Sequence, residues 1–373
     1  MRFFEHQRQA RAQSRRLSFL FAAVILLQLL LVNAALLLPF LFVAWLLNIP
    51  FSQWDRLTPQ YFFAVNTGVS LFYILGGWWI ESSRLADGGH ALAKRIGAVP
   101  AQRLENNRGV ASSRAAEIQF SNIVQEMAIA ANMRAPAAFV LPRDTSINAF
   151  AAGWGPADSV ICVTQGALDH LTRAELMGLV AHEFSHIYEG DTRLNMRLAG
   201  MVLGLELLHN LGIAVTEGSD NKLDAPGMIL GSVLRGAGWL GWTAARMMKA
   251  AISREREFLA DARAVQYTRQ KDGLGATLRK VQWQHDKQGL SFSSIHPAVQ
   301  HMLLVGDWMD TRKMLQTHPP IAERIKRIYG RSMPPLAADE GSAAAAWKNP
   351  FAASQPLPFA QKPHPSNKVN KHE

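Results

Sequence analysis

Two histidines and a glutamate lie close together at residues 181–186, which have the sequence Ala-His-Glu-Phe-Ser-His. His182 and His186 are four positions apart, so on a helix they would share one face, one turn apart. Two imidazoles at this spacing can bind one Zn²⁺, and Glu183 could act as a general base beside them. The alternative is a polar edge on a core helix, but burying these groups without a partner would be costly.

The segment around this motif is predicted to be helical. Thr172 and Glu175 fit a capping box at its start, and Gly190 fits a stop at its end. Between these limits apolar residues recur at helical spacing, at Leu176, Leu179, Val180, Phe184 and Ile187. We therefore expect one helix that carries both histidines and Glu183.

A catalytic zinc site needs a third protein ligand and leaves a fourth position to water. Glu257 and Asp261 are four positions apart in a downstream segment and would share one helical face. We interpret Glu257 as the third ligand and Asp261 as an acceptor that orients a zinc-bound histidine through its other ring nitrogen. The alternative is an ordinary surface helix with charge pairs between successive turns.

Four blocks of sequence together resemble the HtpX and CAAX-prenyl-protease family of integral-membrane zinc metallopeptidases, and the bacterial HtpX-type branch is the closer match. They are His-Glu-Phe-Ser-His with Gly-Asp-Thr-Arg-Leu-Asn, then Ser-Arg-Glu-Arg-Glu-Phe-Leu-Ala-Asp-Ala, then Thr-His-Pro-Pro at 317–320 with Arg324, and the upstream segment 146–153. The resemblance runs from about residue 88 to residue 328. It implies a zincin-like catalytic domain with one zinc ion, acting on misfolded or surplus membrane proteins.

The same resemblance implies further site residues. An edge strand near the zinc helix would hold the substrate backbone by strand addition. The residues in this role are Asn148, Ala149, Phe150 and Ala151. Without the resemblance, this segment is simply part of a small sheet that covers a core. His318 and Arg324 would give transition-state or structural support, because a basic pair could donate to the developing oxyanion. Their alternative is a helix-opening turn with proline in the first turn.

Composition favours a membrane protein. The chain has 373 residues, enough for one catalytic domain and membrane segments, and 49% of them are hydrophobic while 18% are charged. The formal charge of +10 is dispersed and no nucleic-acid-binding motif accompanies it, so anionic lipid is the better partner and nucleic acid is not expected. Cys162 is the only cysteine, so an intramolecular disulfide is impossible, and its apolar neighbours indicate a small packed hydrophobe.

Two N-terminal apolar segments predict a transmembrane hairpin. A basic segment at 1–16 precedes an apolar run at 17–47, and a second run covers 61–80. The first run exceeds the roughly 20 residues of a spanning helix and is too long for a cleaved signal peptide. Basic residues flank the outer ends of the hairpin, so both ends and the catalytic domain should be cytoplasmic. The resemblance to the bacterial branch then implies a multi-pass protein of the inner membrane.

A second hydrophobic pair, at 198–215 and 227–245, lies between the two parts of the predicted zinc site. Glu206 and Arg235 lie at similar distances from the connecting loop, so we expect them to pair, because an unpaired charge in a membrane is costly. We favour a membrane-spanning hairpin at about 198–245. The alternative is that both helices lie at the membrane surface or belong to the soluble domain.

The expected fold class is mainly α with a small β-sheet, a zincin-like α+β catalytic domain at 88–333, together with transmembrane helices. Its expected elements are a linker at 88–113, a helix at 115–133, and strands at 137–141, 147–154 and 159–164. Residues 334–373 are rich in alanine, proline and lysine with little periodicity, which predicts a disordered C-terminal tail.

Zinc-dependent endoproteolysis in membrane-protein quality control is the function that these observations favour. The alternatives are a catalytically silent zinc-binding scaffold, or pseudoprotease, and a polytopic transporter. Glu183 argues against the scaffold, because metal binding alone does not need that carboxylate. The long non-membrane region at 88–197 argues against the transporter.

Overall fold

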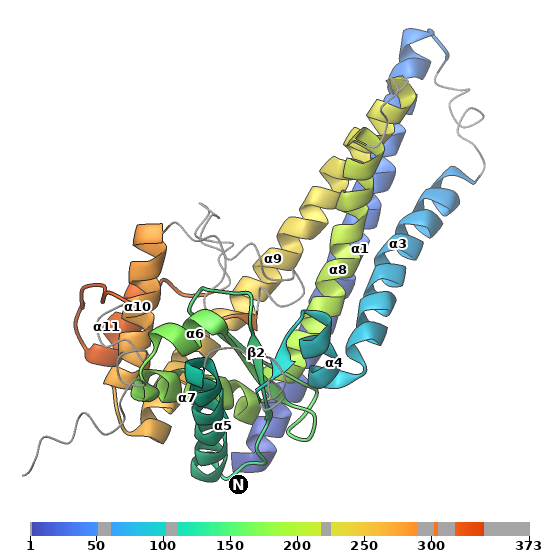
Figure 1. Cartoon of the computed structure of the whole chain (residues 1–373). Helices are drawn as coiled ribbons and strands as arrows, with labels where there is room; N and C mark the ends of the chain where they lie inside the picture. The colour runs from blue at the N-terminus through green and yellow to red at the C-terminus, as the bar shows by residue number, and fades with distance from the viewer. Residues whose placement is uncertain are drawn as a thin grey trace, which may run out of the picture.

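The structure is a computed structural model that describes residues 2–50, 61–101, 111–217, 225–288, 302–304 and 318–338. A slanting helical bundle extends from a domain in which helices pack on a small sheet (Figure 1). The predicted class, mainly helical with a small sheet and with membrane helices, is confirmed.

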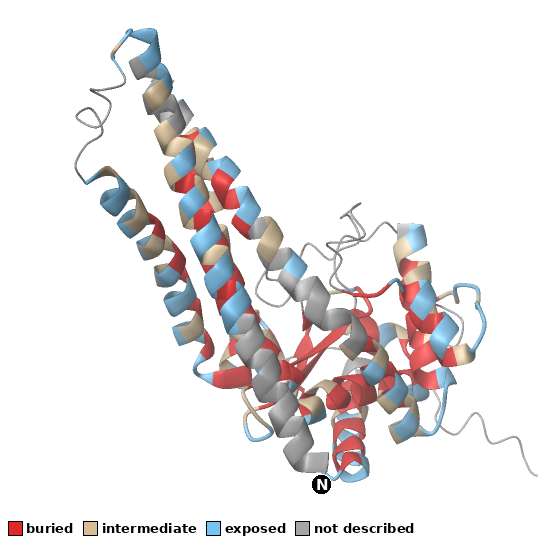
Figure 2. Cartoon of the chain, turned by 180° about the vertical axis from the view of Figure 1, so that it is seen from behind, coloured by how far each residue is buried: buried red, intermediate tan, exposed pale blue. Residues whose placement is uncertain are grey.

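Long helices build the bundle in the described part of the chain. They are α1 (Arg2–Leu46), α3 (Phe62–Leu85), α8 (Asp191–Glu217) and α9 (Ala225–Thr268). Among the described residues, three helices are long and apolar enough to cross a membrane, namely Ser18–Leu37 within α1, α3 and α8. Exposed residues are frequent along the bundle, whereas buried residues gather in the domain (Figure 2). Exposed rings such as Phe19, Phe72 and Trp79 suit a surface that contacts lipid.

Glycines allow the helices of the bundle to approach closely, as is common between membrane helices. A Cβ on Gly212 of α8 would lie 2.3 Å from the backbone nitrogen of Arg235 in α9. Arg235 is therefore aligned with Gly212 and not with Glu206, and its Nη1 lies 4.0 Å from Glu217 Oε1. The predicted alignment was wrong because close packing at glycines, not equal distance from the loop, fixes how the two helices lie together.

A four-stranded mixed sheet forms the centre of the domain, with strand order β1-β2-β4-β3. Its strands are β1 (Val99–Pro100), β2 (Ala137–Leu141), β3 (Ala149–Ala152) and β4 (Val160–Thr164). The central pair, β2 and β4, is parallel, and both outer pairs are antiparallel. The three predicted strands match β2, β3 and β4, although β3 is shorter than expected. Cys162 is fully buried in β4, as predicted.

The segment predicted as a linker is instead structured. It contains α4 (Gly88–Arg95) and β1, and Leu92 and Ala93 of α4 are buried. The small residues that suggested a linker permit close packing, because a Cβ on Gly89 would lie only 2.5 Å from the carbonyl oxygen of Ala152. The prediction of a linker over these described residues was therefore wrong.

Helices cover the two faces of the sheet. The remaining described helices are α5 (Ala111–Ala131), α6 (Gln165–His170), α7 (Arg173–Glu189), α10 (Asp272–Gln288) and α11 (Ile321–Tyr329). The larger core joins one face to α5 and α7 through residues such as Ile161, Phe120 and Leu179. A smaller core lies on the other face, where Phe139 and Phe150 meet Leu92 of α4.

The start of the predicted tail also packs on the domain. Arg279 Nε of α10 donates to the carbonyl oxygen of Pro334 at 2.7 Å, and Ala338 is buried. The prediction of disorder from residue 334 is therefore wrong for 334–338, because two backbone groups there find partners on α10. Residues 339–373 lie outside the described part of the chain.

Candidate metal centre

The helix that carries the two histidines is held firmly at both ends. The Thr172 hydroxyl accepts from the Glu175 backbone, and the Glu175 carboxylate accepts from the Thr172 backbone at 2.7 Å, which confirms the predicted capping box. Gly190 ends α7 with a φ of 75°, a left-handed conformation that favours glycine. Lys280 Nζ of α10 donates to the same Glu175 carboxylate at 2.8 Å, a buried pair that joins α10 to the start of α7.

Three side chains from two helices converge at one point. The Nε2 atoms of His182 and His186 on α7 lie 3.1 Å apart. Glu257 of α9 places Oε2 3.5 Å from His182 Nε2 and Oε1 3.6 Å from His186 Nε2. One potential ligand atom from each of these residues lies within 4.8 Å of the others. These are the three residues that the sequence predicted as metal ligands.

The other ring nitrogen of each histidine faces a carboxylate. His182 Nδ1 lies 3.0 Å from Asp261 Oδ1, and His186 Nδ1 lies 2.8 Å from Asp191 Oδ2. When Nδ1 donates to a carboxylate, Nε2 keeps its lone pair for a metal, and the orientation of the ring is fixed. Asp261 was predicted to contact a histidine in this way, whereas Asp191 was not predicted.

Asp191 also pairs with Arg256, which precedes the third predicted ligand. Asp191 is the first residue of α8 and follows the glycine that ends α7. An acidic residue at the start of a new helix, directly after a glycine stop, was the signal in the sequence. Its contact with His186 depends on the direction in which α8 leaves α7, and helical spacing alone does not determine that direction.

The membrane hairpin and the metal centre share their helices. The sequence predicted a hydrophobic hairpin at about 198–245 and a helical face at Glu257 and Asp261, and α9 joins the second arm of that hairpin and this face in one continuous helix from Ala225 to Thr268. Its far end carries Glu257 and Asp261, while α8 starts at Asp191 and is itself a candidate span. Helix α8 therefore positions the carboxylate that contacts His186, and helix α9 positions the one that contacts His182.

Arg324 of α11 joins the two α9 carboxylates. Its guanidinium is fully buried and donates to both carboxylate oxygens of Asp261, at 2.9 and 2.7 Å. Its Nη1 lies 3.1 Å from Glu257 Oε2 and donates to the carbonyl oxygen of Leu304 at 2.9 Å. A buried charge needs such partners, so Arg324 compensates the two carboxylates.

Burial and neighbouring charges shift the pKa values of the groups at the metal centre in different directions. Burial opposes ionisation of Glu257 and Asp261, but His318 and Arg324 hold the pKa of Glu257 well below its usual range, and Arg324 and His182 lower that of Asp261. Burial lowers the pKa of His182, yet hydrogen bonds to Asp261 and Glu257 outweigh it and raise the pKa to about 9. Burial and the neighbouring His182 lower the pKa of His186 to about 4. Without metal, His182 is therefore the protonated member of the pair.

Glu183 and His318 lie close to the same point. Glu183 is buried, its Oε2 has no hydrogen-bond partner among the described residues, and burial raises its pKa. His318 is also buried and places Nδ1 3.4 Å from Glu257 Oε1. The structure thus brings together every predicted ligand and every predicted catalytic side chain.

The predicted substrate segment forms one edge of the sheet. Residues Asn148, Ala149, Phe150 and Ala151 are buried, and the last three belong to β3, which follows β4 as the outermost strand. The carbonyl oxygen of Ala149 accepts from the Leu304 backbone at 2.9 Å. Leu304 therefore covers part of this edge, and its own carbonyl oxygen accepts from Arg324.

The donor set fits zinc. Two imidazole nitrogens and one carboxylate, with a fourth position left for water, form the composition of catalytic zinc sites. The two buried carboxylates at the centre, Glu257 and Asp261, face one permanent cation, Arg324, so an additional positive charge at the Nε2 atoms would be compensated.

Comparisons with known proteins agree with this geometry. The sequence profile of Peptidase family M48 matches residues 113–332. A Protease HtpX homolog of Ligilactobacillus salivarius (strain UCC118) is 37% identical over 215 residues, which cover 56% of this chain and 71% of that protein. The Protease HtpX of Legionella pneumophila (strain Lens) is 30% identical over 212 residues, covering 56% of this chain and 74% of that protein.

One solved structure has a weaker likeness. The crystal structure of S. mikatae Ste24p aligns with a TM-score of 0.36 and 16% identity, covering 87% of this chain and 66% of that one. The profile covers more than half of the chain and ends just after α11, so it includes all three converging ligands. The chain therefore belongs to peptidase family M48 and is an integral-membrane zinc metallopeptidase.

Proposed function

We propose that this chain is an endopeptidase that cleaves membrane proteins at the cytoplasmic surface of the bacterial inner membrane, as part of membrane-protein quality control. The observation that carries the proposal is the convergence of His182, His186 and Glu257, with the outer nitrogen of each histidine held by a carboxylate. Such a site combines ligand positions with a fixed tautomer, which catalytic zinc requires.

His182, His186 and Glu257 would hold one zinc ion. When bound, zinc supplies Lewis acidity, which makes a water molecule more acidic and polarises a carbonyl oxygen. Asp261 and Asp191 keep the Nε2 atoms of the two histidines directed at this position. Both aspartates therefore act as positioning residues.

Glu183 is the proposed general base. Its carboxylate takes a proton from the attacking water and delivers it to the nitrogen of the leaving amine. Burial raises the pKa of Glu183, so its carboxylate accepts a proton more readily than an exposed glutamate would. The unpartnered Oε2 is available for this transfer, because no described residue donates to it.

His318 and Arg324 receive different roles. His318 Nδ1 faces Glu257, whereas its Nε2 has no hydrogen-bond partner among the described residues, so Nε2 could donate to the oxyanion that develops on the scissile carbonyl. Arg324 already contacts Asp261, Glu257 and the Leu304 carbonyl. We therefore assign Arg324 a positioning role, which is the structural one of the two roles that the resemblance implied.

The substrate would bind along β3 as an additional strand. Ala149 directs its carbonyl oxygen to the open edge, where it accepts from Leu304, and backbone groups alternate along a strand. Ala151 would therefore present its own N–H and C=O to the same edge. Recognition through backbone groups requires an extended and locally unfolded substrate, which agrees with a role in removing misfolded proteins.

The arrangement of helices supports a site at the membrane surface. The candidate span α3 ends at the domain, the candidate span α8 begins there, and α9 carries Glu257. Arg84 lies in the last turn of α3, Lys94 and Arg95 follow that span, and basic residues precede the span of α1. This distribution favours the cytoplasm for both flanks. Substrates that are themselves in the membrane would meet the site at this position.

One paired experiment tests this function. The full chain and its Glu183→Gln variant are purified in detergent, their zinc is measured, and cleavage of a loosely folded membrane protein is followed with and without chelator. We expect about one zinc in both proteins and a loss of about 10²–10⁴-fold in the cleavage rate of the variant. Glu126→Gln, which alters an exposed glutamate paired with Arg173, is the matched control and should retain activity.

Two results would contradict the proposal. If the wild type binds zinc but cleaves nothing that Glu183→Gln spares, the chain is a zinc-binding scaffold. If neither protein binds zinc, the ligand assignment itself is wrong.

A further inference from the structure

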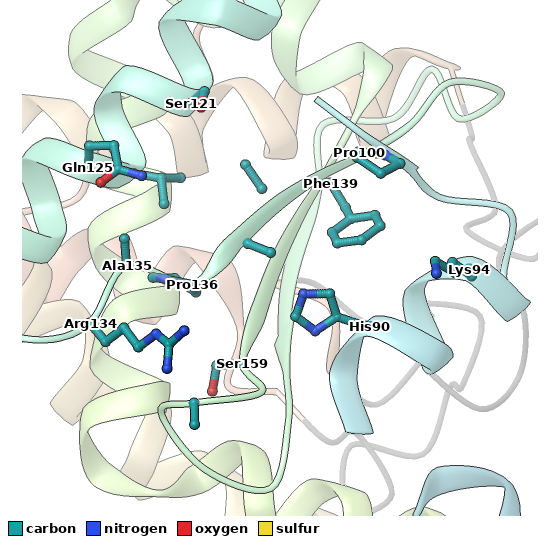
Figure 3. Close-up of a pocket in the computed structure, with 14 residues that line it drawn as sticks. His90, Lys94, Pro100, Ser121, Gln125, Arg134, Ala135, Pro136, Phe139 and Ser159 are labelled. Atoms are coloured by element: carbon teal, nitrogen blue, oxygen red, sulfur yellow. The ribbon is translucent and has the colours of Figure 1, made fainter. Parts of the chain in front are cut away.

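A cavity of about 490 Å³ lies between α4 and α5, beside the β1–β2 side of the sheet (Figure 3). His90 and Lys94 of α4 form one wall, Ser121 and Gln125 of α5 contribute to another, and Arg134 follows α5. None of the residues that line it belongs to the metal centre. The cavity therefore needs an explanation of its own.

Charge in this cavity is of one sign. Lys94 and Arg134 line it, and no aspartate or glutamate does so among the described residues. Both side chains are exposed and form no ion pair within the described part of the chain. Their charged ends extend toward the cavity from opposite sides (Figure 3). An anion in the cavity would thus meet cations that are not already neutralised.

The rest of the lining is largely apolar. Phe139 of β2 forms part of the floor, and the ring of His90 meets it edge to face, with centroids 5.8 Å apart. Val124 and the short segment from Ala135 to Ala138 complete this surface. A ligand for this cavity should therefore combine a compact anion with an uncharged part, as phosphate esters do.

The wall formed by α4 is joined to a membrane helix. Only Ala86 and Asp87 separate α4 from α3, whose candidate span ends at Leu85. Arg95 Nη2 of α4 donates to Glu81 Oε1 of α3 at 2.5 Å, so α4 is fixed at the end of this span. We propose that the cavity binds a phosphate ester, with its phosphate attracted by Lys94 and Arg134 and its uncharged part against Phe139.

Two sources could supply this chemistry, namely the headgroup of an anionic phospholipid and a soluble phosphate ester. The test uses the full chain in nanodiscs of phosphatidylcholine and follows the midpoint of thermal unfolding. One arm adds glycerol 3-phosphate, with glycerol as its uncharged counterpart. The other arm replaces part of the phosphatidylcholine with phosphatidylglycerol. The variants are Lys94→Gln/Arg134→Gln and, as a matched control, Arg143→Gln/Lys271→Gln, which removes two exposed cations outside the cavity.

We expect a rise in the midpoint in one arm for the wild type and for the control variant. The cavity variant should need at least about tenfold more of the ligand for the same rise, because the positive charge that attracts the phosphate is removed. A response to glycerol 3-phosphate identifies a soluble ester, and a response to phosphatidylglycerol alone identifies a lipid. The proposal is overturned if neither arm stabilises the wild type, or if the cavity and control variants lose the response equally. None of these readouts depends on proteolysis.

Discussion

The metal centre and the α4–α5 cavity both gather charged side chains, but they compensate charge in opposite ways. At the centre, Arg324 is fully buried and contacts both Asp261 and Glu257. In the cavity, Lys94 and Arg134 are exposed and have no ion pair within the described residues. Removing a charge from water is costly, so the buried site must contain its own counter-charges, whereas an exposed site can take them from solution.

This difference in charge also explains which of the two sites can accept an additional cation. Two buried carboxylates at the centre, both with lowered pKa, face one permanent cation, Arg324. In the metal-free protein the proton on His182, whose pKa is raised to about 9, adds positive charge beside them. Zinc would replace this proton. The cavity instead contains positive charge without a carboxylate among its described lining residues, so it is suited to an anion.

Arg324→Met should have the largest effect on stability. It leaves two buried carboxylates without their cation, which costs about 3–5 kcal/mol when one partner of a buried pair is removed. The free energy of unfolding of the zinc-free protein in detergent is the measurement. Arg327→Met on the same helix is the control, because Arg327 is exposed and its pair with Glu323 should contribute less than about 1 kcal/mol. Equal losses in the two variants would contradict a special role for burial.

Asp191→Asn should weaken zinc binding by about 10–100-fold, because it disturbs the acceptor that orients His186. Competition with a chelator of known affinity measures this loss. Asp169→Asn, an exposed aspartate that accepts from Gln165, is the control and should bind zinc as the wild type does. If Asp191→Asn also binds normally, the contact with His186 has no function in metal binding.

Zinc affinity should rise with pH by up to about tenfold per unit and level off near pH 9. The sign follows from His182: its pKa of about 9 means that zinc must displace a proton below that pH and none above it. His186, with a pKa of about 4, is neutral throughout this window and adds no dependence. Asp261→Asn removes a hydrogen bond that raises the pKa of His182, so its plateau should begin at lower pH. A plateau at the same pH in both proteins would contradict this account.

The smallest effect should be that of the cavity on the centre. Lys94→Gln/Arg134→Gln changes no residue that contacts a proposed metal ligand, so the free energy of zinc binding should stay within about 0.3–0.5 kcal/mol of the wild type. The same chelator competition provides the measurement. A larger change would show that the two regions are coupled.

The sequence predicted the residues at the metal centre better than the contacts that position them. His182, His186 and Glu183 lie on one helix, where spacing alone determines which side chains converge, and the capping box fixed the start of that helix. Asp191 escaped prediction because its contact crosses the turn at Gly190 and depends on how α8 packs. Arg324 was predicted as a site residue, but its partners on α9 were not, because they depend on how α11 packs beside that helix.

Composition misled where packing decided the outcome. Gly89 and its small neighbours suggested a linker, but they permit α4 to lie against the sheet. The change from apolar to charged residues after 245 suggested two elements, although α9 continues through it, because a helix can pass from lipid to protein without a break. Hydrophobic patterning reports the surroundings of a segment, and such a change of surroundings is not by itself the end of a helix.

The most direct test of the central claim is X-ray absorption at the zinc edge of the purified full chain, compared with His186→Gln. The account predicts one zinc with nitrogen and oxygen donors at about 2.0–2.2 Å, two of them imidazoles, and the loss of one imidazole contribution in the variant. A sulfur donor near 2.3 Å would indicate Cys162 and contradict the assignment. An unchanged spectrum in the variant would show that His186 does not bind the metal.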